Sequence, residues 1–196
     1  MKKRTYRIIG WAIFSLTILF LATSCPRPQS ATNAAPQNPP FFRDVRPDQG
    51  PWEIRVAGDK NSFQKLYVHR KEDAMIAATF ARIDEPINID LTNPRNQQAL
   101  AEMALESFCK SIEAKCLVSS SDLAWILGTP LQYIYVRFSA EKKGFTPMKG
   151  LVYYRFDQPL QTMYILLANS KVYDGFETVF LNYLSKAEFR PEGFSP

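Results

Sequence analysis

The sequence has few of the residues from which catalytic and metal sites are usually built. Its 196 residues include one histidine, three cysteines and eight glycines. It contains no GxSxG, HExxH, GxGxxG or CxxC string and no Walker loop, the common signatures of enzymes and nucleotide-binding proteins. The single histidine, His69, stands beside Arg70 and Lys71 at the end of an expected strand, so we expect it to be solvated. The sequence therefore predicts a protein that is not an enzyme and holds neither metal nor cofactor.

Two Ser-x-x-Lys strings, at residues 62–65 and 107–110, match the nucleophile motif of penicillin-binding enzymes. The companion strings SDN and KTG are missing, and Ser107 falls on the apolar side of an expected helix. We interpret both strings as chance matches. An unrecognised hydrolase stays an alternative that no motif supports.

The sequence also has little net charge beyond its first residues. The formal net charge is +5, but Lys2, Lys3, Arg4 and Arg7 supply four of the positive charges. The remaining 20 Lys and Arg residues face 19 Asp and Glu residues. Because nucleic-acid-binding domains carry a basic patch or stripe, this balance argues against a nucleic-acid partner.

The first 24 residues have the parts of a secretory signal peptide. A basic start precedes an apolar run of 15 residues from Ile8 to Ala22, and small residues follow at Ala22 and Ser24. A helix needs roughly 20 apolar residues to cross a bilayer, so this run is short for a permanent span. We predict a signal peptide over residues 1–24.

The next residue places a cysteine at the expected cleavage site. The segment Leu21-Ala22-Thr23-Ser24-Cys25 resembles the lipobox of bacterial lipoproteins. The resemblance implies a diacylglyceryl group on Cys25 and cleavage just before it. An uncleaved signal anchor and a soluble cleaved product are the alternatives, and each sends the residues after Cys25 across the membrane. We expect an exported, membrane-anchored protein on the periplasmic or lumenal side of the cell envelope.

Residues 25–51 read as a lipidated cysteine followed by a linker rich in Pro, Ala, Asn and Gln. Such a composition buries too little apolar surface to fold. Pro-rich chain extends by about 3.1 Å per residue, so this linker reaches up to about 80 Å. Residues 52–196 are left to form one globular domain.

The domain alternates expected strands with two expected helices. The segment 161–169 is apolar on both of its sides, because Met163, Ile165 and Leu167 alternate with Tyr164, Leu166 and Ala168. A strand with one face in water would alternate apolar and polar residues. We therefore predict an α+β fold with an antiparallel β-sheet covered by helices on both faces. The expected strands are 52–57, 63–69, 74–83, 131–139, 151–157 and 161–169, with a possible further one around 125–127.

Both expected helices have local start signals. Asn93 is a good N-cap and Pro94 suits the first helical position, with apolar residues at helical spacing as far as about Ile112. The closing helix carries Asp174 and Glu177 in a D-x-x-E arrangement, which predicts a capping box.

Cys109 and Cys116 form an even pair in a compartment where disulfides persist. On one continuous helix their Cα atoms would lie roughly 10 Å apart, beyond disulfide reach. A bridge between Cys109 and Cys116 therefore requires the helix to end between them. Two buried free thiols are the alternative.

The order and spacing of the expected strands and helices from about Trp52 onward, about three quarters of the chain, resemble the Mog1/PsbP-like fold. The segments that carry the resemblance are GTPLQYIYVRFS, AEKKGFTPMKG, LVYYRF, TMYILLANS and GFETVFLNYLSKAEF, from residue 128 to residue 189. The resemblance implies an α/β/α sandwich and, because most members bind partners without doing chemistry, a binding role. No functional residue of the family transfers to a matching motif here.

One loop has the composition of a contact site. Between Ala140 and Gly150, three lysines surround two apolar residues. The loop reads either as a plain hairpin connection or as a contact for a protein partner or anionic head groups. Our leading hypothesis is an envelope lipoprotein that binds or helps assemble a membrane-associated partner, and a small-ligand carrier is the alternative. The candidate contact residues are Lys142, Lys143, Phe145, Met148 and Lys149.

Overall fold

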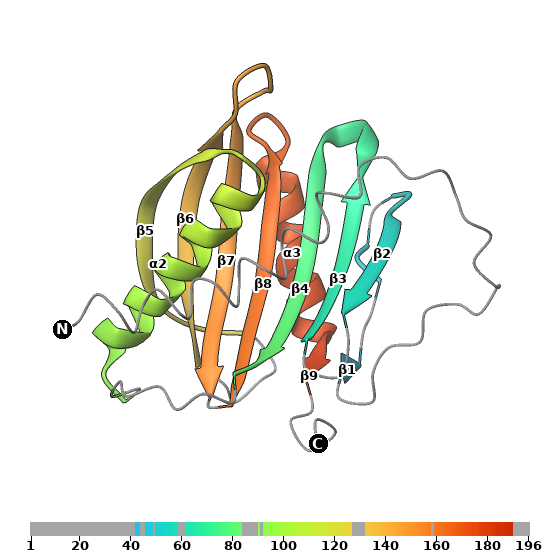
Figure 1. Ribbon diagram of the computed structural model, residues 1–196. Helices are drawn as coiled ribbons and strands as arrows, with labels where there is room; N and C mark the ends of the chain where they lie inside the picture. The colour runs from blue at the N-terminus through green and yellow to red at the C-terminus, as the bar shows by residue number, and fades with distance from the viewer. Residues whose placement is uncertain are drawn as a thin grey trace.

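The computed structural model describes residues 42–43, 46–48, 50–58, 62–83, 90, 92–126, 132–157 and 159–189. The predicted signal peptide and Cys25 lie outside these ranges. Within them, neither α-helix combines the length and apolarity needed to cross a membrane. The elements are β1 (Phe42–Arg43), β2 (Glu53–Gly58), β3 (Ser62–His69), η1 (Arg70–Glu72), β4 (Ala74–Arg82), α2 (Pro94–Ser111), β5 (Lys115–Trp125), β6 (Gln132–Glu141), β7 (Met148–Asp157), β8 (Leu160–Asn169), α3 (Tyr173–Lys186) and β9 (Glu188–Phe189) (Figure 1).

The strands form one large sheet and one small one. Seven strands pair in the order β2-β3-β4-β8-β7-β6-β5, and every neighbouring pair is antiparallel. The two-residue strands β1 and β9 pair separately. The predicted α+β class with an antiparallel sheet is confirmed.

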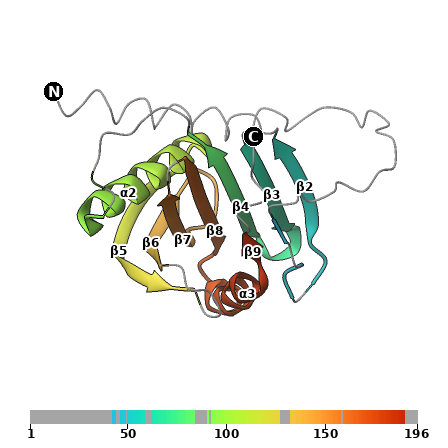
Figure 2. The ribbon, with the colours of Figure 1, turned by 90° about the horizontal axis from the view of Figure 1, so that it is seen from below.

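Alternate side chains of the central strands belong to two different apolar clusters. Along β8, Tyr164 and Leu166 pack in the cluster that contains α3, whereas Ile165 and Leu167 pack in the cluster that contains α2. Successive strand residues point to opposite faces of a sheet, which explains this division. Figure 2 shows α2 and α3 on different sides of the strands.

The start and end of α2 follow the local signals. The Asn93 side chain accepts a hydrogen bond from the Arg95 N–H at 3.0 Å, and Pro94 occupies the first turn. The helix ends at Ser111, and Glu113 then takes a left-handed conformation with φ of 55°. This turn brings the Cα atoms of Cys109 and Cys116 to 6.1 Å, and the two cysteines form a disulfide. The predicted bridge is therefore present.

Two elements differ from the sequence prediction. The sequence pattern predicts no long strand after Cys116, yet β5 runs to Trp125 along the edge of the sheet. The predicted capping box of the last helix is wrong, because α3 begins at Tyr173 and its N-cap, Val172, makes no side-chain capping bond. Asp174 consequently lies inside the first turn.

The segment before β2 is tied to the end of α3. Lys186 Nζ lies 2.9 Å from Asp48 Oδ2, and the Trp52 indole donates to the Asp48 carbonyl at 3.2 Å. Strand β1 pairs with β9 just beyond α3. Contacts with the domain therefore extend N-terminal to the predicted boundary at residue 52. In Figure 1 this pairing lies at the bottom, opposite the connection between β6 and β7.

Candidate functional site

Three connections meet at one end of the large sheet, which we call the loop end. They are the β3–β4 turn (residues 70–73), the β6–β7 loop (residues 142–147) and the β8–α3 turn (residues 170–172). The Asn169 N–H donates to the Asp73 carbonyl at 3.0 Å. The Ser170 N–H and hydroxyl both donate to the Pro147 carbonyl, at 3.0 and 2.7 Å. These bonds hold the connections side by side at the top of Figure 1.

The β6–β7 loop presents an aromatic ring to solvent. Phe145 is 66% exposed, and its N–H donates to the Lys142 carbonyl at 3.1 Å to close the turn. Gly144 allows this turn because its φ is +84°, a conformation that side chains rarely adopt. Lys142 Nζ lies 5.3 Å from the centre of the Phe145 ring, within cation–π range. The tip is thus an exposed ring with an ammonium group over its face.

The lysines of the loop are held in different ways. Lys142 donates to the Ile112 carbonyl and to the Glu113 carboxylate, both at 3.1 Å, which ties the loop to the turn after α2. Lys143 is exposed. Lys149 Nζ lies 5.7 Å from the Tyr173 ring centre, at the start of α3. The structure therefore groups Lys142 with Phe145, and places Lys149 over the neighbouring helix start.

Met148 does not share the loop's exposure. It is the first residue of β7, it is half-buried, and it packs against the cluster that contains α2. The prediction that Met148 lies at an apolar loop tip is wrong. Strand β7 already begins at Met148, and the side chain of Met148 points toward the core. Phe145 is the exposed apolar residue of this loop.

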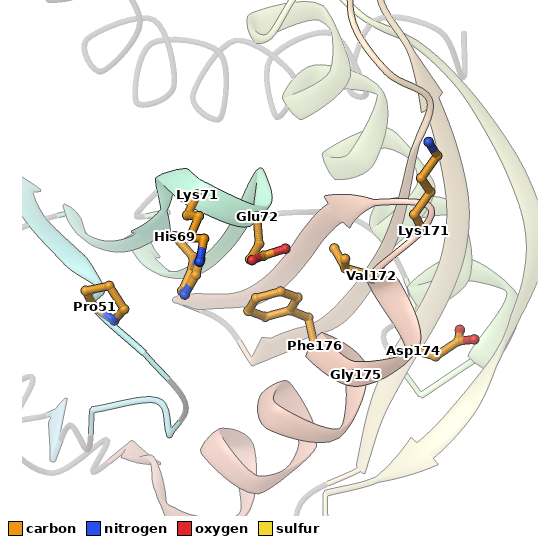
Figure 3. Close-up of a pocket in the computed structure, with 9 residues that line it drawn as sticks. All are labelled: Pro51, His69, Lys71, Glu72, Lys171, Val172, Asp174, Gly175 and Phe176. Carbon is orange, nitrogen blue, oxygen red and sulfur yellow. The ribbon is translucent and has the colours of Figure 1, made fainter.

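A second feature of the loop end is a cleft beside the start of α3, which sequence reasoning did not single out. Its volume is about 570 Å³. Figure 3 shows the β3–β4 turn on one side and the first turn of α3 on the other. We call it the α3 cleft, and its lining residues are Pro51, His69, Lys71, Glu72, Lys171, Val172, Asp174, Gly175 and Phe176.

His69 is part of the floor of the α3 cleft and is not solvated as predicted, since it is only 6% exposed. Strand alternation puts it on the same face of β3 as Tyr67, toward α3. There its ring meets the rings of Trp52 and Phe176 edge-on, with centroids 5.2 and 5.3 Å away. Its Nδ1 is buried and has no hydrogen-bond partner. Neither Trp52 nor Phe176 is close to His69 in sequence. The sequence around His69 shows only charged neighbours such as Arg70, which is why it predicts a solvated histidine.

The first turn of α3 adds unpaired donors to the cleft. The first bond of the helix runs from the Phe176 N–H to the Val172 carbonyl at 3.3 Å. The N–H groups of Asp174 and Gly175 precede it and make no hydrogen bond within the described residues. A helix start with free N–H groups carries a partial positive charge. Space is open there, because a Cβ at Gly175 would meet no atom within 4 Å.

The candidates for chemistry are not assembled into a reactive site. The described residues contain no group of three or more His, Cys, Asp or Glu that could hold a metal ion. Ser107 is buried on α2, and Lys110 pairs with Glu106 at 2.6 Å. The carboxyl group of Asp90, an acid just before α2, accepts hydrogen bonds from the Thr92 N–H and hydroxyl, which lower its pKa.

The fold of this chain has a distant likeness to a solved protein structure. The chain matches no protein-family model, and no curated protein matches it in sequence. The solution structure of cyanobacterial PsbP (CyanoP) from Synechocystis sp. PCC 6803 superposes with a TM-score of 0.48 at 9% sequence identity. The match covers 71% of this chain and 94% of that one. The likeness carries neither a family nor a function over to this chain, and membership among exported lipoproteins stays a prediction.

Proposed function

We propose that this protein is a membrane-anchored, non-catalytic module of the cell envelope that binds a membrane-associated protein through its loop end. The observation that carries the proposal is Phe145, a large apolar side chain 66% exposed on a loop whose neighbours hold it in place. Exposed aromatic residues at an ordered site are typical anchors of protein interfaces. Lys142 and Lys143 beside it suit a partner surface with acidic groups.

The closed core supports a binding role over an internal ligand site. We infer that α2 and α3 cover both faces of the sheet, because their clusters use alternate residues of the same strands. The central side chains of both clusters, such as Tyr67 and Val136, are fully buried. Packing of this kind leaves the surface of the domain as the place available for recognition.

The position of the chain's N-terminal side favours a protein partner over the lipid of the anchoring membrane. Strand β1 starts at Phe42, at the end of the molecule opposite the β6–β7 loop (Figure 1). A lipid on Cys25 would enter at that side, through a linker that extends about 3.1 Å per residue. The tether would therefore be attached at the end of the molecule opposite the loop that carries Phe145.

The proposal is tested by recovery of a partner from solubilised membranes with the full chain as bait. Phe145→Ser removes the exposed ring, and Leu181→Ser removes another exposed apolar side chain, 42% accessible on α3. We expect the first variant to lose most of the protein recovered by the wild type and the second to retain it. Equal recovery by both variants would place the contact elsewhere.

A further inference from the structure

The disulfide and the β6–β7 loop are connected through the turn that follows α2. We propose that the bridge between Cys109 and Cys116 holds the loop in its binding geometry, and that reduction of the bridge by a dithiol releases the loop and weakens partner binding. This inference rests on the function proposed for Phe145 and adds a redox control to that site.

The turn closed by the bridge supplies the acceptors that hold the loop. Residues 110–115 lie between the two cysteines. Lys142, the first residue of the loop, donates from Nζ to the Ile112 carbonyl and to the Glu113 carboxylate, both at 3.1 Å. Its ammonium group lies 5.3 Å from the centre of the Phe145 ring, and its carbonyl accepts the Phe145 N–H. One lysine therefore links the bridged turn to the exposed ring.

The bridge also fixes the strand that lies beside the base of the loop. Cys116 is the second residue of β5 and pairs with Ala140 on β6, two positions before Lys142. Cys109 is buried near the end of α2. The bridge thus ties the packed end of the helix to the strand that borders the loop. Figure 1 shows the end of α2 and the start of β5 at the same end of the sheet as the β6–β7 loop.

The bridged turn holds a backbone conformation that its sequence disfavours. Glu113 has a φ of 55°, in the left-handed region that residues other than glycine rarely adopt. Such a conformation costs free energy and persists only where the surrounding structure enforces it. Here the bridge enforces it together with backbone bonds, such as that from the Ala114 N–H to the Cys109 carbonyl at 3.0 Å. Without the bridge the turn opens more readily, and Lys142 then loses its two acceptors.

Reduction of the bridge proceeds by thiol–disulfide exchange with a dithiol. Cys116 is the accessible point of attack, because it is half-buried whereas Cys109 is only 3% exposed. A thiolate of the dithiol bonds to the Cys116 sulfur, and the Cys109 sulfur leaves and takes up a proton. The second thiol of the dithiol then displaces Cys116 as a thiol. Two electrons and two protons pass to the bridge, and the dithiol becomes a disulfide.

Hydrogen exchange at the Phe145 N–H tests the coupling without any partner. The full chain in detergent micelles is compared before and after dithiothreitol, and complete reduction is checked by thiol alkylation and intact mass. We expect exchange to become at least about fivefold faster on reduction, because the open turn no longer holds the loop. The Cys109→Ala, Cys116→Ala double variant should exchange at the faster rate with and without dithiothreitol, which excludes an effect through Cys25.

Two lysine variants test the route of the coupling. Lys142→Met removes the link while the bridge stays intact, so it should speed exchange as reduction does and abolish the response to dithiothreitol. Lys143→Met, at the exposed neighbouring lysine, is the matched control and should respond like the wild type. Unchanged exchange after complete reduction of the wild type would overturn the proposal, as would an undiminished response in Lys142→Met.

Partner recovery from solubilised membranes separates this proposal from the proposed function. The oxidised wild type should recover the partner, and the double cysteine variant should recover severalfold less. If the oxidised wild type recovered no protein, the proposed function would be contradicted, while hydrogen exchange would still decide the coupling. Equal recovery by the wild type and the double variant, together with loss in Phe145→Ser, would overturn the redox control.

Discussion

The ring of Phe138 on β6 fills the space directly above Gly150 on β7. The two residues are cross-strand partners at the base of the β6–β7 loop. A Cβ at Gly150 would stand 2.1 Å from Cζ of the ring, closer than any real contact. Gly150 is therefore required for Phe138 to lie flat in the cluster that contains α2, and the pair fixes where the loop leaves the sheet.

Replacing Gly150 tests this packing. We expect Gly150→Ala to lower the free energy of unfolding by about 1 to 3 kcal/mol, the usual cost of overpacking a core. Gly175→Ala is the matched control, because its Cβ would meet nothing within 4 Å. Alanine should stabilise that helical position by about 0.5 kcal/mol. Urea unfolding of the purified chain measures the free energy of unfolding of both variants. If both substitutions changed it in the same direction, the packing of Phe138 against Gly150 would be contradicted.

The disulfide is expected to stabilise the turn after α2. The Cys109→Ala, Cys116→Ala double variant should lose about 2 to 3 kcal/mol, since the bridge closes a short loop in the unfolded chain. The measurement is urea unfolding with and without reductant. Reductant should destabilise the wild type and leave the double variant unchanged. A wild type that does not respond to full reduction would show that the bridge adds nothing.

Stability should fall at alkaline pH through buried tyrosines. Burial, aided by the Glu177 carboxylate, raises the pKa of Tyr173 from 10.0 to about 12. The neutral phenol is favoured in the folded chain, so this contribution is intact below pH 10 and is lost as pH rises from about 10 to about 12. The loss from Tyr173 at pH 11 should be about 1 kcal/mol.

Tyr173→Phe separates this effect from that of other tyrosines. The Tyr173 hydroxyl is buried without a hydrogen-bond partner, so the variant should be at least as stable as the wild type at neutral pH. Its stability should fall less steeply above pH 10. The stability of the variant should still fall somewhat with pH, because burial also raises the pKa of Tyr154. Identical slopes in wild type and variant would rule out Tyr173 as a source.

The anchor proposed at Cys25 has a direct chemical test. Intact mass of the mature chain should correspond to a start at Cys25 plus a diacylglyceryl group. Blocking lipoprotein signal peptidase should leave residues 1–24 attached, and Cys25→Ala should release the protein from membranes. A mature product that retains Met1 in untreated cells would contradict lipidation.

Local signals in the sequence were sufficient for part of the fold. Asn93 and Pro94 mark the start of α2 because a cap depends only on adjacent residues. The two-sided apolar pattern from Met163 to Leu167 likewise predicts a buried central strand, as β8 is. Strand β5 could not be found this way. It lies at the sheet edge with most of its side chains exposed, so its sequence lacks the apolar pattern of a buried strand.

The candidate site could not be predicted as well from the sequence, because it is formed by residues that lie far apart along the chain. His69 looks solvated beside Arg70, but its environment is set by Trp52 and by Phe176, more than a hundred positions away. The α3 cleft likewise requires the β3–β4 turn to meet the first turn of α3. The exposed Phe145 could be predicted, since it lies between lysines in a glycine-containing loop.

Site-specific photo-crosslinking in living cells would show whether the loop end is the binding surface. A photoreactive phenylalanine analogue would replace Phe145 in the full chain and, in a matched strain, Leu181. We expect a discrete crosslinked protein product in the membrane fraction from position 145 and none from position 181. Crosslinks to lipid alone at position 145, or the same products from both positions, would contradict this expectation.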